Sequence, residues 1–229
     1  VKSELNVGVD DQLVMKAQTM RKFVTGIYDY TMTTTSFKPV ANGEKSIKIN
    51  GSSVEWCGQT FFQLNRFDDT YKVLSRSYFE SESDDDFSIS GAISEDEIWQ
   101  RIRLNPDALP TGSIFFIPSL VTARLRHRKL KSESANASLN PYTRNLVSGN
   151  NLKSYMLTYG AGTPDERSVE FIFEDKFPYR IRALSEEYMD GFQNPKRLRS
   201  TAVLTKQIML DYWRTHDPEH EILRKELGL

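Results

Sequence analysis

Few side chains in this sequence have the type and spacing that catalysis requires. The chain contains one cysteine, Cys57, which stands between Trp56 and Gly58. A reactive thiolate needs a base or an electropositive setting, and the nearby carboxylate of Glu55 opposes ionisation of the thiol. We therefore predict that Cys57 is a structural, buried residue within a strand, and that it is not a catalytic nucleophile.

The histidines and the known catalytic motifs add no further chemistry. His216 and His220 are four residues apart, but Pro218 marks a helix start between them. The pair therefore does not share one helical face, as the two histidines of an H-E-x-x-H zinc motif do. The sequence has no Walker loop, dinucleotide-binding fingerprint or nucleophile elbow. It predicts no metal site, no cofactor and no identifiable catalytic residue.

One segment is unusually basic, and it reads Arg124-Leu125-Arg126-His127-Arg128-Lys129. On a strand, which we predict for Leu120–Lys131, the side chains of Arg124, Arg126 and Arg128 would project from one face as a positive stripe roughly 13 Å long. Together with His127, they are the candidate binding residues for a phosphate or carboxylate group. The alternative is an ordinary outer face whose arginines pair with acidic side chains across the sheet, and we favour it.

The acidic run Glu80–Asp86 has enough carboxylates for a calcium ion. It lacks the spaced aspartates, central glycine and terminal glutamate of an EF-hand loop, so we expect a solvated loop that protects a sheet edge. A carboxylate pair for glycoside hydrolysis cannot be selected among the 31 acidic residues without geometry.

Composition narrows the classes of partner. The 229 residues include 30 Lys and Arg against 31 Asp and Glu, and the resulting net charge of -1 gives no global field for nucleic acid or an anionic membrane. A single cysteine excludes an intramolecular disulfide. No run approaches the ~20 apolar residues of a transmembrane span. Because the sequence begins at Val1 without a basic and apolar leader, we expect a soluble fragment of a longer precursor.

Short runs of aromatic, β-branched and Thr residues, split by turn residues, predict a mainly β fold with a few short helices. We expect a curved antiparallel sheet or open barrel in a single elongated domain over residues 1–229, with a sub-boundary near 90–95 as the alternative. Strands are predicted at Thr25–Phe37, Lys45–Asn50, Ser53–Arg66, Tyr71–Glu80, Ser113–Ile117, Leu120–Lys131, Lys153–Tyr159, Ser168–Glu174, Tyr179–Tyr188 and Thr201–Arg214.

Two helices have local start signals. The helix predicted for Ser94–Asn105 should begin with a capping box, in which Ser94 and Glu97 cap each other's amides. The residues that this helix should pack onto the sheet are Ile98, Trp99 and Ile102. A second, short helix is predicted for Pro218–Leu227, with Asp217 as its N-cap.

Several short segments together carry a family resemblance: Phe23–Tyr28 (FVTGIY), Val54–Gly58 (VEWCG), Ser77–Glu80 (SYFE), Glu95–Trp99 (EDEIW), Leu109–Gly112 (LPTG), Arg124–His127 (RLRH), Phe177–Tyr179 (FPY), Asp211–Trp213 (DYW) and Lys225–Leu229 (KELGL). With them the chain resembles, over nearly its whole length, a group of Bacteroidetes envelope proteins that often carry the label septum formation inhibitor Maf. The resemblance implies a periplasmic or outer-membrane-associated location, with a lipoprotein-type signal upstream.

True Maf proteins are nucleotide pyrophosphatases of α/β fold that open with a Ser-x-Ser-Pro-Arg-Arg motif. Nothing in Val1–Tyr30 resembles that motif, so none of their catalytic residues is carried over. The stretch Glu95–Tyr188 is also similar in pattern to periplasmic domains with a curved antiparallel sheet, such as lipoprotein carriers. A shared fold does not by itself imply a shared function.

From these observations we expect a non-enzymatic binding or scaffold module of the cell envelope, whose partner is an amphipathic ligand or an envelope protein. The alternative is a hydrolase that acts on an envelope component through an unrecognised carboxylate pair. An apolar cavity without convergent ionisable groups would favour the binding module. Clustered carboxylates with perturbed pKa values in a cleft would favour the hydrolase.

Overall fold

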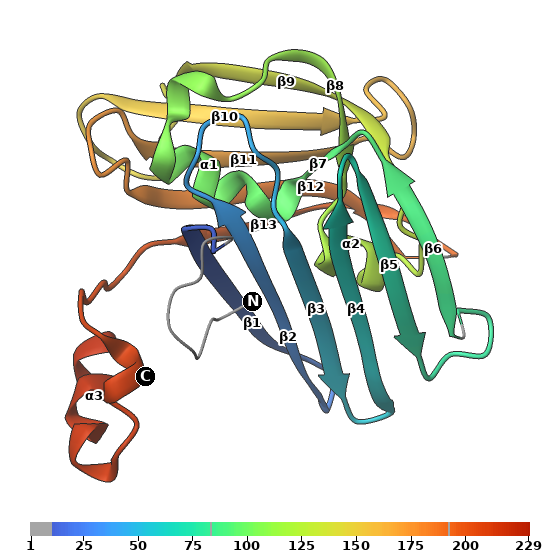
Figure 1. Ribbon diagram of the computed structural model, residues 1–229, viewed down its shortest axis with the longest axis horizontal. Helices are drawn as coiled ribbons and strands as arrows, with labels where there is room; N and C mark the ends of the chain where they lie inside the picture. Colours follow the sequence, from blue (N-terminus) through green and yellow to red (C-terminus); the bar gives the residue numbers. More distant parts are fainter. Residues whose placement is uncertain (1–10, 83, 192) are drawn as a thin grey trace.

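The computed structural model describes residues 11–82, 84–191 and 193–229. Within them the chain forms two β-sheets with short helices between the sheets (Figure 1). Strands account for 49% of the residues and helices for 15%, so the prediction of a mainly β fold with a few short helices is confirmed. Neither sheet closes on itself in this part of the chain.

The first sheet is an antiparallel meander in chain order. Its strands are β1 (Val14–Thr25), β2 (Tyr28–Pro39), β3 (Lys48–Glu55), β4 (Gly58–Phe67), β5 (Thr70–Ser77) and β6 (Asp85–Ser90). Along β2 every second residue from Met32 to Lys38 is buried, because successive side chains alternate between the face that the helices cover and the opposite face.

The second sheet runs in the order β13-β12-β11-β10-β9-β8-β7, and all its pairs are antiparallel except β7 with β8. Its strands are β7 (Ile93–Ser94), β8 (Gly112–Ile117), β9 (Glu133–Pro141), β10 (Leu152–Tyr159), β11 (Arg167–Glu174), β12 (Ile181–Asp190) and β13 (Lys196–Val203). The chain passes from the first sheet to the second between Ser90 and Ile93, near the boundary predicted as the alternative at residues 90–95. The assignment of a single domain stays a prediction.

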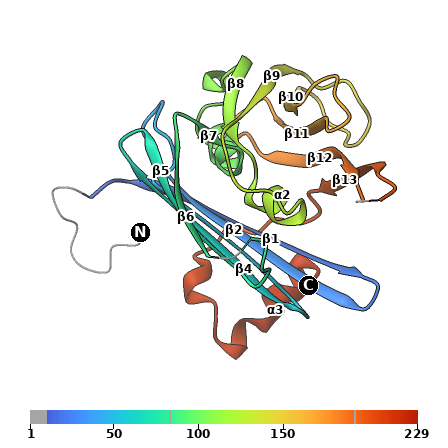
Figure 2. The same ribbon diagram turned by 90° about the vertical axis from the view of Figure 1, so that its right-hand side faces the viewer.

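Short helices fill the space between the sheets, and they are η1 (Glu95–Glu97), α1 (Ile98–Leu104), η2 (Pro106–Ala108) and α2 (Leu120–Leu125). Figure 2 shows α2 between β12 and the first sheet. The helix predicted over Ser94–Asn105 is confirmed. Ile98 and Ile102 are fully buried in the core of the second sheet, and the Trp99 ring lies 5.2 Å from that of Phe171.

The strand predicted for Leu120–Lys131 is wrong, because this stretch contains α2 and then leaves regular structure. Ser119 is the N-cap, and its side chain accepts a hydrogen bond from the amide of Val121. The helix has only six residues, too few for its apolar positions to display a helical period against the basic residues that follow.

Other strand predictions differ from the structure at turns and polar segments. The single strand predicted for Ser53–Arg66 is a hairpin of β3 and β4, with its turn at Trp56 and Cys57. The strand predicted for Thr201–Arg214 ends at Val203. Sequence reasoning missed β1, β6 and β9, whose polar residues give weak strand signals although backbone pairing holds all three in the sheets.

Beyond β13 the chain leaves the sheets (Figure 1). It forms η3 (Tyr212–Arg214), η4 (Pro218–Glu221) and α3 (Ile222–Leu227), so the predicted C-terminal helix is confirmed. Asp217 precedes it, although its side chain makes no capping hydrogen bond. No described helix is long and apolar enough to cross a membrane.

Candidate functional site

The structure places the four predicted binding residues on α2 and the loop after it, not on a strand. Arg124, His127 and Arg128 line one hollow of about 270 Å³, and Arg126 does not. Arg124 is buried on α2, where its guanidinium lies over the Phe79 ring and 4.0 Å from a carboxylate oxygen of Glu55. Arg128 lies 3.5 Å from Asp165. The arginines therefore do not form a stripe on one strand face, since a short helix and the loop after it turn neighbouring arginines in different directions. That these residues bind an anion stays a prediction.

The other two predicted binding residues, His127 and Arg126, have different surroundings. His127 has a positive φ of 50°, and its ring contacts the Glu82 carboxylate and packs edge-on against Phe79. Arg126 is the C-cap of α2, and its guanidinium lies 5.2 Å from the centre of the Tyr188 ring. Of the four residues, Arg126 is the one that lines a larger groove between the two sheets.

This groove, of about 570 Å³, lies between β1 of the first sheet, α2, and strands β11, β12 and β13 of the second sheet. We call it the inter-sheet groove. Met20 and Leu125 are 54% and 42% exposed there, so the groove presents apolar surface to solvent. Its apolar lining consists of Met20, Phe23, Val121, Leu125, Leu184 and Ala202.

The polar lining of the inter-sheet groove is mainly basic. Among the described residues that line it, Arg21, Lys22, Arg126 and Arg167 are cationic and Glu186 is the one carboxylate. Glu186 accepts a hydrogen bond from Arg167 at 2.8 Å and one from Arg21 at 3.4 Å. Arg126 makes no ion pair within the described part of the chain.

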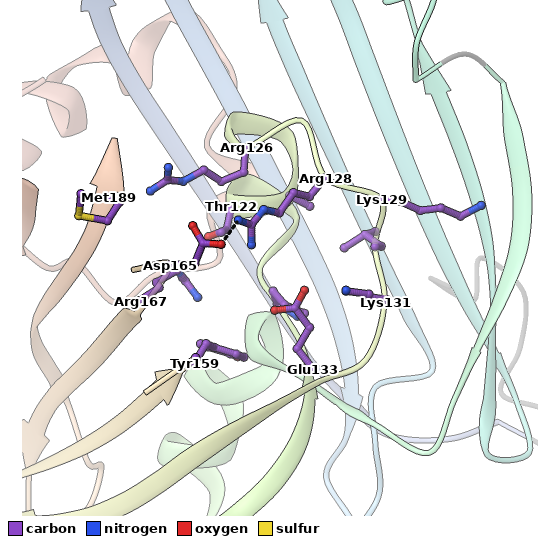
Figure 3. A pocket seen from close by; sticks show the side chains of 14 residues that line it. Thr122, Arg126, Arg128, Lys129, Lys131, Glu133, Tyr159, Asp165, Arg167 and Met189 are labelled. Atoms are coloured by element: carbon purple, nitrogen blue, oxygen red, sulfur yellow. Dashed lines mark ion pairs between the residues drawn. The ribbon is translucent and has the colours of Figure 1, made fainter. Parts of the chain in front are cut away.

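A second pocket, of about 120 Å³, adjoins the groove and shares Thr122, Arg126 and Arg167 with it. Figure 3 shows Arg126 extending toward Met189, whereas Arg128 is held by Asp165. The same view shows Lys129 pointing away from this pocket, toward Asp85 at 2.5 Å. The two hollows therefore meet at Arg126.

A buried ion network forms the floor that the two hollows share. Arg167 donates two hydrogen bonds of 2.7 Å to Glu95 and one of 2.8 Å to Glu186. Burial disfavours its charge, but the two carboxylates outweigh burial and hold the pKa of Arg167 well above its usual value. Burial likewise raises the pKa of Glu186, and Arg167 and Arg21 outweigh it, so this pKa is lowered. Both charges are fixed by this pairing.

The sequence did not reveal that the three acids of η1 are buried. Acidic residues in the first turn of a helix are usually solvated, and the sequence pattern is the same in both cases. Asp96 accepts hydrogen bonds from the Ser119 hydroxyl at 2.8 Å and from the Leu120 amide at 2.9 Å. Burial raises the pKa of Asp96 to about 6. Glu97 accepts from the Ser46 amide and from Arg101, so the reciprocal capping box with Ser94 does not form.

The prediction that Cys57 is buried is wrong. Cys57 is exposed at the turn between β3 and β4, where its amide donates to Glu55 at 2.7 Å and its thiol lies 3.6 Å from the Tyr28 hydroxyl. A hairpin tip places the residue outside both packed faces, which a continuous strand would not. Its assignment as non-catalytic stays a prediction.

Carboxylate clusters elsewhere are already paired or exposed. Around the predicted acidic loop, Asp84 and Asp86 pair with Arg76, and the segment from Asp85 onward is strand β6 rather than loop. Near the C-terminus, Asp217, Glu219 and His220 bring one ligand atom each within 4.8 Å of one another. Asp217 and Glu219 are exposed and His220 is half-buried, and an acidic group of this kind does not by itself indicate a metal site.

No protein-family model, curated protein or solved structure matches this chain.

Proposed function

We propose that this chain is a non-enzymatic binding module that takes an amphipathic small molecule in the inter-sheet groove. The carrying observation is the groove itself, a hollow of about 570 Å³ whose lining is apolar with a few convergent polar groups. Ligand pockets in proteins have this size and composition. Its apolar side chains belong to four elements, so they are positioned by the packing of both sheets against α2.

The carboxylates near the groove favour binding over hydrolysis. A glycosidase-type pair needs one proton-bearing acid and one free carboxylate, both in reach of substrate. Glu95 and Glu186 instead accept hydrogen bonds from the same guanidinium of Arg167. Asp96, whose pKa is raised, is buried against Ser119 and Leu120 and does not line the groove. Within the inter-sheet groove, the hydrolase alternative thus lacks an accessible proton-bearing acid.

The resemblance to Bacteroidetes envelope proteins supports a periplasmic or outer-membrane-associated location for this module. In such a compartment, lipids and their breakdown products are the amphipathic molecules at hand. Neither nucleic acid nor another macromolecule is needed to account for the groove.

A titration with the neutral apolar fluorophore N-phenyl-1-naphthylamine tests the proposal. The folded protein should enhance its fluorescence saturably, since transfer into an apolar groove removes the probe from water. Leu125→Gln should weaken this binding about tenfold, because it places an amide in the lining.

Leu198→Gln is the matched control. Leu198 has the same 42% exposure as Leu125 but does not line the groove, so its variant should bind the probe as the wild type does. Absence of saturable binding by the wild type, or equal loss in both variants, would contradict a binding function for the groove.

A further inference from the structure

We propose that the ligand of the inter-sheet groove is an anionic amphiphile with one chain, and that Arg126 binds its carboxylate or phosphate head. This inference rests on the proposed function, and it adds the chemical class of the ligand and the residue that selects it. It is carried by the charges of the groove and by the position of Arg126.

The groove is locally cationic although the whole chain is not. Its described lining holds four basic side chains and one carboxylate, whereas the entire sequence has a net charge of -1. The single carboxylate, Glu186, is already bound by Arg167. The basic side chains therefore offset the free-energy cost of transferring an anionic head group from water into this site. A cationic head group would instead be repelled by them.

Arg126 is the basic residue that is positioned to meet the head. Of the other basic residues that line the groove, Arg21 and Arg167 each have a carboxylate partner within 4.0 Å. Lys22 offers a single ammonium group without the planar fork of an arginine. Arg126 has none within the described residues, and its contact is the face of Tyr188. Stacking on a ring fixes the plane of a guanidinium while its edge donors stay available, which is the geometry that binds carboxylate or phosphate in a bidentate way.

The location of Arg126 also fixes how the ligand would lie. It stands where the apolar groove meets the second pocket, and both hollows include it. With its head group at Arg126, the ligand would place its alkyl chain along Leu125, Leu184 and Ala202. Arg167 is not an alternative head site, because Glu95 and Glu186 occupy its donors.

The volume favours one chain over two. A hollow of about 570 Å³ lies in the middle of the range for drug-sized ligands. A fatty acid or a monoalkyl phosphate is of this size, whereas a lipid with two chains would leave one chain in water. The shared chemistry is therefore a single alkyl chain with one anionic group.

Displacement of N-phenyl-1-naphthylamine by four compounds that each carry one twelve-carbon chain tests this inference. Dodecanoate and dodecyl phosphate carry the proposed anionic heads, dodecanol is neutral, and dodecyltrimethylammonium is cationic. All are used below their micelle concentrations. At least one anionic compound should bind the wild type about tenfold more tightly than dodecanol, the effect expected for a charge-assisted hydrogen bond. The tighter of the two anions identifies the head as carboxylate or phosphate.

Arg126→Gln should remove this preference, measured within the variant as the ratio of its affinities for the anionic compounds and for dodecanol. A circular dichroism spectrum and an unfolding temperature like those of the wild type show that the variant is folded. Arg128→Gln is the matched control, since Arg128 is a neighbouring arginine that does not line the groove and is paired with Asp165. It should keep the anion preference. Arg126→Lys keeps the charge without the planar fork, and it should retain part of the preference.

The outcomes separate the two proposals. If the wild type does not bind the neutral probe, the proposed function fails. If it binds the probe but takes dodecanol or dodecyltrimethylammonium as tightly as both anions, the groove is a binding site and the anionic class is wrong. If Arg126→Gln keeps the anion preference, or Arg128→Gln loses it equally, Arg126 is not the residue that binds the head.

Discussion

At the scale of single residues, the three adjacent acids of η1 bind three different parts of the structure. Glu95 binds Arg167 of the second sheet, Asp96 caps α2, and Glu97 binds the segment before β3. Each carboxylate is buried and has its own donors. This run therefore connects both sheets to α2, the helix that forms one wall of the inter-sheet groove.

Asp96 should make stability depend on pH in a predictable direction. Burial raises its pKa from 3.8 to about 6 in the folded protein, so between these pH values the folded state holds a proton that the unfolded state has lost. The contribution of Asp96 to stability is thus greatest below pH 3.8 and falls as pH rises toward 6, by about 3 kcal/mol in total. Asp96→Asn does not titrate and should lack this fall.

Urea unfolding at several pH values between 4 and 7.5 measures the effect. The comparison uses the difference between wild type and Asp96→Asn, because the other titrating groups are common to both proteins. This difference should shift against the wild type as pH rises toward 6 and should then be constant. Parallel pH profiles for the two proteins would contradict a raised pKa at Asp96.

At the scale of elements, local signals predicted α1 but not α2. The first helix has an N-cap at Ser94 and apolar residues at helical spacing, and all of that information lies within a dozen residues. The second has six residues, and much of its stabilisation comes from Asp96, far away in sequence. The basic segment was predicted to be a strand because Arg124 and Arg126 alternate with other residues, as side chains on one face of a strand do. Its local pattern did not reveal the contact with Asp96 that stabilises a helix instead.

The packing of α2 on β3 depends on a glycine. A Cβ at Gly51 would lie 2.8 Å from Cδ1 of Leu120 and 3.1 Å from its Cβ, and Leu120 is itself only 3% exposed. Gly51→Ala should therefore destabilise the protein by about 1–3 kcal/mol through overpacking. The small gain from replacing glycine in a strand offsets part of this.

A double-mutant cycle with Leu120→Ala tests this contact. Leu120→Ala alone should cost about 2–5 kcal/mol through the cavity that it leaves. In the double variant the new methyl group occupies part of that cavity, so the combined loss should be smaller than the sum of the two single losses. Strict additivity in urea unfolding would show that Gly51 and Leu120 are not in close contact.

At the scale of the whole molecule, the inter-sheet groove could not be predicted from sequence. Its lining residues come from β1, α2, β11, β12 and β13, and they lie at positions from 20 to 202. Sequence reasoning predicted the mainly β fold because alternation and turn residues are local properties. It did identify Arg126 as a binding candidate, through its unusual basic context, but it could not distinguish Arg126 from Arg124 and Arg128. That distinction depends on which carboxylates the folded chain brings within reach.

The C-terminal segment should be dispensable for both stability and groove binding. The buried apolar core of the described residues extends no further than Leu184. Beyond β13, large apolar side chains such as Met209, Trp213 and Leu229 are 84%, 63% and 73% exposed, and none of them lines the groove. A chain truncated after Lys206 should therefore unfold within about 2 °C of the full chain, because less than about 1 kcal/mol of burial is lost.

Thermal unfolding followed by circular dichroism, together with the titration of N-phenyl-1-naphthylamine, measures both expectations. Limited proteolysis of the full chain provides an independent check, since a segment with little burial should be cleaved before either sheet. A large fall in the unfolding temperature after truncation would mean that the segment packs on the sheets in solution. A loss of probe binding with unchanged stability would instead place the exposed Trp213 region in the binding site, because removal of surface distant from the groove cannot otherwise change affinity for a neutral apolar probe.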